Sequence, residues 1–339
     1  MVCAGTVAAL AVAATTYMGQ LVTLAPWMQK TIPLLLILSI AIMNVRGTRG
    51  SASVLNWTTG VKVLAIVVMS ILLLTLGQGA SGTAAPALVA PPSLISAAAT
   101  AMISVLWAYE GWQYVTFVAG EAKDPQRTIP RALITGTVIL IVIYILANLA
   151  YASALGTARM AASDRVAGEA VAAVLGPTAG KAIALAIIIS MYSAAHATVI
   201  TVPRVYFSMA QDGLFFRKLS EVHPRFGTPA VAVVASCAWA AVLAMTGTFE
   251  QLLTYVVFIG WIFYALGAAA VIALRIKRPL AARPFRVPGY PITPALFVVA
   301  AAVIVGNTVF TQPLQAVIGL GVVMLGAPAY LIWKRRLPT

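Results

Sequence analysis

LWAYEGW, residues 106–112, places an acidic residue beside a glycine within an apolar segment that runs from Leu94 to Val118. A carboxylate at the bilayer centre costs about 2.5–3.5 kcal/mol on insertion scales, so Glu110 should face a bundle interior or a water-filled cavity. Gly111 weakens a helix by about 1 kcal/mol relative to Ala. The pair predicts a discontinuous membrane helix whose freed backbone groups bind a solute. A Glu hydrogen-bonded to a neighbouring helix, without a ligand, is an equally open interpretation.

The composition around this stretch is that of a membrane protein. Apolar residues make up 61% of the 339-residue chain and charged residues 9%, and the mean hydropathy is +0.97. A soluble domain carries about 25% charged residues. The chain is therefore expected to be an all-α integral membrane protein, because backbone groups in lipid must be hydrogen-bonded within helices.

Ten apolar segments are long enough, or nearly so, to cross the membrane, which takes about 20 residues at 1.5 Å each. The second segment is short, and it gains length if residues 26–30 belong to it. The segments are Val2–Ala25, Thr31–Val45, Val54–Leu76, Leu94–Val118, Ala132–Leu155, Gly176–Phe207, Ala230–Met245, Leu252–Leu274, Ile292–Phe310 and Leu314–Trp333.

The basic residues set the orientation. Of 22 Lys and Arg, 17 lie in alternate loops and the C-terminal tail, and the opposite loops hold four. The positive-inside rule places the richer loops, and both chain ends, in the cytoplasm. The net charge of +14 thus belongs to membrane loops and does not indicate nucleic acid. Cys3 and Cys237 show no disulfide or metal-ligand spacing, and no cofactor motif is expected.

Three stretches together resemble the amino-acid–polyamine–organocation permeases, and within them the L-amino-acid transporter branch. Each is moderately specific, and the three occur in that family's order over essentially the whole chain. They are WAYEGW with GEAKDPQRTIPRA (residues 107–112 and 120–132), PRVYFSMAQDGLF (203–215) and RPFRVPGYP (283–291).

The resemblance implies a five-plus-five inverted-repeat transporter fold followed by two extra helices, with about ten of the usual twelve transmembrane helices in this chain. Residues 1–339 would form a single transmembrane domain. Helices three to five would fall in 1–77, helices six to ten in 94–275, and helices eleven and twelve in 292–333. Helices one, two and part of three have no counterpart here, so the resemblance implies a chain that is unstable and does not transport alone. A genuinely shortened protein that pairs with itself or another subunit to close the site is the competing possibility.

The same resemblance implies a substrate site at the broken sixth helix. Trp107, Ala108 and Tyr109 would offer backbone carbonyls and aromatic surface to the substrate, Glu110 would lie beside them, and Gly111 would permit the break. Trp107 or Trp112 could act as a gate.

A coupling site is expected on the fifth and eighth helices. In sodium-independent relatives a lysine at the place of Lys62 puts its ammonium where sodium-coupled members bind the ion, near Ser190 and Ser193. Snorkelling of Lys62 to the interface is the alternative. His196 stands where related exchangers often carry Asn, and an imidazole with an unperturbed pKa of about 6.5 could relay protons. A neutral His hydrogen-bonded within the bundle is the plainer interpretation.

The expected function is secondary transport of small neutral L-amino acids by alternating access, as sodium-independent exchange or proton-linked uptake, in a bacterial cytoplasmic membrane. The partners would be an amino acid and membrane lipid. A cationic amino acid or polyamine transporter, or a non-transporting fragment of such a permease, is the alternative. An intramembrane enzyme is not favoured, because the chain contains neither HExxH nor GxSxG.

The loop pattern predicts that positions 127 and 286 lie in the cytoplasm and positions 81 and 164 outside. Single-cysteine variants at these four places, treated on intact cells with an impermeant thiol reagent, measure the orientation. Reaction from outside at position 127 or 286 would contradict it.

Overall fold

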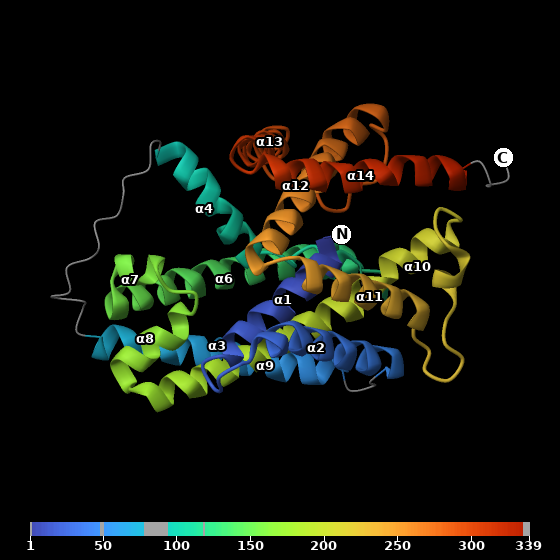
Figure 1. The fold of residues 1–339 in the computed structure, drawn as a ribbon. Helices are drawn as coiled ribbons and strands as arrows, with labels where there is room; N and C mark the ends of the chain where they lie inside the picture. Colours follow the sequence, from blue (N-terminus) through green and yellow to red (C-terminus); the bar gives the residue numbers. More distant parts are fainter. Residues whose placement is uncertain (1, 48–50, 78–93, 118, 335–339) are drawn as a thin grey trace.

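The computed structural model describes residues 2–47, 51–77, 94–117 and 119–334, and in these ranges the chain is helical, with no strand (Figure 1). Residues 78–93, which include position 81, lie outside the described residues. The α-helices are α1 Val2–Met18, α2 Pro26–Arg46, α3 Ser51–Leu76, α4 Leu94–Ala108, α5 Tyr114–Phe117, α6 Pro125–Leu155, α7 Thr157–Ala161, α8 Val166–Leu175, α9 Pro177–Thr201, α10 Pro203–Gln211, α11 Ala230–Thr246, α12 Phe249–Lys277, α13 Ile292–Thr311 and α14 Pro313–Lys334, and the 3₁₀ turns are η1 Ala119–Glu121 and η2 Arg217–Ser220.

The predicted fold class, an all-α membrane protein, is confirmed. Within the described residues, seven helical stretches are long and apolar enough to cross a membrane: α2, α3, α6, α9 with α10, α12, α13 and α14. The other three predicted spans correspond to shorter helices. α1 and α11 have 17 residues each, about 25 Å, and α4 has 15 residues before the chain unwinds.

A proline explains where the second helix begins. That pattern extends the first segment to Ala25, but α1 ends at Met18 and Ala25 is extended at φ −66° and ψ 153°. Pro26 disfavours the helical region for the residue before it and is itself suited to a helix start. The second helix accordingly begins at Pro26, and residues 26–30 lengthen it to 21 residues.

Two further boundaries differ from the expectation. α6 starts at Pro125, after Asp124 in the left-handed conformation. The hydropathy pattern places the start at Ala132, because the first two turns of the helix are polar. The single segment expected over Gly176–Phe207 is divided at Pro203 into α9 and α10. The loop between α6 and α9 contains α7 and α8, which no span prediction included.

α1 crosses the middle of the bundle, with α2, α9, α11 and α12 packed around it (Figure 1). Its core residues are small: Ala8 and Ala9 have no exposed surface, and Ala4 and Ala11 are 3% exposed. Small residues let membrane helices approach closely, which supplies the van der Waals contact that holds them together. At Gly5 a built Cβ would lie 2.7 Å from Cγ2 of Val256. α1 is therefore the helix around which the others assemble.

Two other helical glycines are uncrowded. A Cβ built at Gly136 of α6 or Gly267 of α12 has no atom within 4 Å, apart from its immediate chain neighbours and its own helix backbone. Neither residue has a positive φ. These two positions differ from Gly5 in neighbours, not in backbone conformation.

Gly5→Ala is expected to lower stability by about 1–3 kcal/mol, because an added methyl group overpacks a contact with a stiff valine. Gly136→Ala is the matched control and is expected to raise stability by roughly 0.5–1 kcal/mol, since Ala loses less backbone entropy in a helix. Thermal unfolding of both variants in the same detergent measures the difference. Equal shifts would contradict the close packing of α1.

Candidate functional site

The predicted break in the sixth-helix segment is present. α4 ends at Ala108, α5 begins at Tyr114, and residues 109–113 form turns. Gly111 has φ +117°, a region that side-chain-bearing residues rarely adopt. The nearest atom to a built Cβ is in the Tyr114 ring at 3.8 Å, so space is available. Glycine is needed here for its backbone conformation and not for a close approach.

Glu110 is held by two side chains that the sequence did not single out. The Tyr264 hydroxyl donates to Oε1 at 2.5 Å, and Nε2 of Gln113 donates to the same oxygen at 2.6 Å. The amide of Gly111 donates to Oε1 of Gln113 at 3.2 Å. Gln113 thus joins the carboxylate to the unwound backbone, and Tyr264 ties both to α12.

Two of the three carbonyls expected to face a substrate already accept hydrogen bonds. The Tyr144 hydroxyl of α6 donates to the Ala108 carbonyl at 2.9 Å, and the Glu110 amide donates to that of Trp107 at 3.0 Å. A carbonyl oxygen has two lone pairs, so each of these carbonyls retains one for a ligand. Both carbonyls therefore have a hydrogen-bond donor from the protein itself.

The aromatic residues of the motif face different neighbours. Trp107 makes an edge contact with Phe249, with ring centroids 5.4 Å apart, and its indole packs among the core residues. Trp112 is 46% exposed and lies 5.5 Å from the Tyr264 ring. Of the two tryptophans considered as gates, Trp112 is the more exposed.

Lys62 reaches α9 as expected. Its Nζ donates to the Ser190 carbonyl at 3.1 Å, and the side chain is half-buried. One turn further along α9, the Ser193 hydroxyl lies 3.3 Å from that of Thr58. The structure therefore brings Lys62, Ser190 and Ser193 to one contact between α3 and α9.

His196, also on α9, faces α2. Nδ2 of Asn44 donates to the Ile40 carbonyl at 2.8 Å and lies 2.9 Å from Nδ1 of His196. The Ile40 carbonyl fixes the amide orientation, because the opposite one would set two oxygens against each other. Nδ1 must then be an acceptor, which places the proton of a neutral imidazole on Nε2. The geometry fits a neutral, hydrogen-bonded histidine.

The predicted site residues fall into three places: the helix break, the α3–α9 contact and the α2–α9 contact. Among the described side chains, no hydrogen bond joins the break to Lys62. Sequence reasoning missed Gln113, Tyr264 and Asn44. Gln113 stands three residues after Glu110 and Asn44 is an amide in an apolar segment, so both carried a signal, whereas Tyr264 is 154 residues from its partner.

Comparison with known proteins gives consistent relatives. A family model described as "Amino acid permease" matches residues 1–328. The serine/threonine exchanger SteT of Bacillus subtilis is 29% identical over 94% of this chain and 74% of its own length. The human cystine/glutamate transporter is 28% identical over 88% of this chain, and the human b(0,+)-type amino acid transporter 1 is 28% identical over 82%.

The chain spans 60% of the length of the human cystine/glutamate transporter and 56% of that of the b(0,+)-type transporter. All three relatives bear the names of transporters or exchangers, so the alternative of an intramembrane enzyme is set aside. Because the amino acid permease family model matches residues 1–328, the chain belongs to the amino acid permease family.

Proposed function

We propose that this protein carries small neutral L-amino acids across a cytoplasmic membrane by alternating access, with the substrate at the helix break. The observation that carries the proposal is the unwound segment 109–113, with Gly111 at φ +117° beside Glu110. Irregular backbone at membrane depth is tolerated only where it is buried in protein or lines a cavity. In inverted-repeat transporters such breaks bind the substrate.

The hydrogen bonds of Glu110 favour a neutral over a cationic substrate. Oε1 already accepts from Tyr264 and Gln113, which leaves less of the carboxylate to attract an ammonium group. A cationic amino acid or a polyamine is the second candidate, because Glu110 is the acidic residue of the break. The exchanger among the relatives supports exchange, and a neutral His196 held by Asn44 gives little support to proton-linked uptake.

The proposed unit is one transmembrane domain over 1–339, with 94–275 as the second repeat, 1–77 as part of the first and 292–333 as two additional helices. Both chain ends would lie in the cytoplasm of a bacterium. The excess of Lys and Arg in alternate loops supports that orientation.

Gly111→Ala is expected to lower uptake roughly tenfold, because a side-chain-bearing residue at this φ costs about 1–3 kcal/mol. Gly120→Ala is the matched control, since Gly120 has no positive φ and a built Cβ meets no atom within 4 Å. The measurement is uptake of radiolabelled serine and alanine into proteoliposomes, with and without internal amino acid, normalised to inserted protein.

Uptake that is competed by arginine or putrescine but not by neutral amino acids would replace the first candidate substrate class with the second. No saturable uptake of either class would contradict the proposed function. Equal loss in both glycine variants would show that residues 109–113 are not the site.

Lys62→Ala is expected to lower uptake at least about tenfold, since a hydrogen bond from a charged group contributes about 1.5–3 kcal/mol. Lys181→Ala, an exposed lysine on the same helix as Ser190, is expected to transport like the parent. Uptake by the parent should be equal in sodium and choline buffers. A requirement for sodium would contradict the role given to the Lys62 ammonium.

A further inference from the structure

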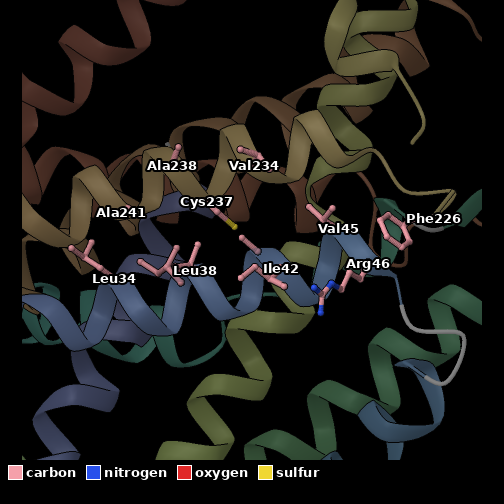
Figure 2. Close-up of a pocket in the computed structure, with 12 residues that line it drawn as sticks. Leu34, Leu38, Ile42, Val45, Arg46, Phe226, Val234, Cys237, Ala238 and Ala241 are labelled. Atoms are coloured by element: carbon pink, nitrogen blue, oxygen red, sulfur yellow. The ribbon is translucent and has the colours of Figure 1, made fainter. Parts of the chain in front are cut away.

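A groove of about 520 Å³ lies between α2 and α11 (Figure 2). Its floor is made of the buried residues Ile37, Ala41 and Cys237, which are 2%, 8% and 4% exposed. The rims are open, with Leu38 55% exposed and Val234 55% exposed. Pockets that hold small ligands have similar volumes, about 300–1,000 Å³.

Larger side chains line the groove mostly from α2 and smaller ones mostly from α11. α2 contributes leucines and isoleucines, whereas α11 contributes Ala238 and Ala241 at the facing positions. A space of this size left empty would forfeit the contacts of the atoms that line it. In a bilayer the surrounding solvent is hydrocarbon, so an acyl chain is the occupant at hand.

The length of the groove matches one leaflet. Its lining runs along α2 from Leu34 to Arg46, about 18 Å at 1.5 Å per residue, against about 15 Å for half of the hydrocarbon core. Arg46 is the charged residue among those that line it and stands at one end, beside Phe226 (Figure 2). The groove is apolar along its length and basic at that end.

The basic end is fixed in place. The Thr228 hydroxyl donates to the Val45 carbonyl at 2.7 Å, which ties the loop before α11 to the end of α2. The same loop carries Arg225, whose guanidinium carbon lies 5.4 Å from the centre of the Phe226 ring. Arg46 is exposed and makes no ion pair within the described part of the chain. Its guanidinium is available to an anion at the membrane surface.

We propose that the groove binds an anionic phospholipid, with one acyl chain between α2 and α11 and the headgroup phosphate on Arg46. A guanidinium can hold a phosphate through two parallel hydrogen bonds, which an ammonium cannot match in geometry. The apolar length selects a lipid. A zwitterionic headgroup offers the same phosphate, but its ammonium group would be repelled by Arg46 and by the nearby Arg225, so an anionic headgroup is favoured.

The test uses the 339-residue chain in nanodiscs of equal phosphatidylglycerol and phosphatidylcholine with identical acyl chains. After re-extraction in detergent, mass spectrometry measures the lipids that stay bound. We expect phosphatidylglycerol to be enriched about fivefold, the contribution of one basic residue near a membrane surface. Arg46→Gln should remove most of that enrichment. Lys277→Gln, another exposed cation in the last turn of a helix, should retain it.

Cys237 on the groove floor gives a second measurement that is independent of transport. In a Cys3→Ala background, phosphatidylglycerol should slow the reaction of Cys237 with N-ethylmaleimide about fivefold more than phosphatidylcholine does, and Arg46→Gln should abolish the difference. Ala238→Phe, which fills the groove from an exposed position, should lower the retained lipid.

Three results would overturn the proposal. Equal retention of the two lipids by the parent would show a groove that takes hydrocarbon without regard to charge. Equal enrichment in the Arg46 and Lys277 variants would place the anionic lipid elsewhere. Cross-linking between copies that carry Ala238→Cys would show that a second protein covers this face.

Discussion

Buried backbone groups must be hydrogen-bonded, and in lipid no water is available to do this. The unwound segment between α4 and α5 lacks the regular hydrogen bonds of a helix. Side chains of the segment itself and of the surrounding helices supply partners instead. Tyr144 of α6 caps the end of α4, Gln113 holds the Gly111 amide, and Tyr264 of α12 holds Glu110. The break thus depends on the positions of two other helices, and a substrate bound there, as proposed, would compete with or join these bonds.

The rest of the bundle uses a different means of cohesion. Around α1 the helices approach through alanine and glycine, and polar contacts appear at only a few points, such as Asn44 with His196 and Lys62 with the Ser190 carbonyl. Each of these polar contacts lies on α9, toward α2 on one side and α3 on the other. Close packing of small residues holds the bundle together, whereas the contacts of the ionisable side chains Lys62 and His196 lie on α9.

The sequence predicted the helical class and the break, because a charged residue beside a glycine in an apolar run is costly unless the bundle provides a polar site for it. It failed at helix ends, where Pro26 and Pro203 overrode the hydropathy pattern. It also missed Tyr264. A tyrosine in an apolar helix is common near the membrane–water interface, and no local sequence pattern indicates a hydrogen-bond partner 154 residues away. Hydropathy assigns residues to membrane or loop, but pairing between helices depends on how their faces meet.

The uncrowded glycines have a mechanical consequence. Gly136 and Gly267 lie in α6 and α12, the same helices whose tyrosines hold the break, and Gly267 is less than one turn from Tyr264. A helix is more compliant where a residue lacks Cβ and has no neighbour braced against it. α6 and α12 can therefore flex at these points while their hydroxyl groups follow the unwound segment. The hydrogen bonds from Tyr144 to the Ala108 carbonyl and from Tyr264 to Glu110 can then be kept while the unwound segment moves.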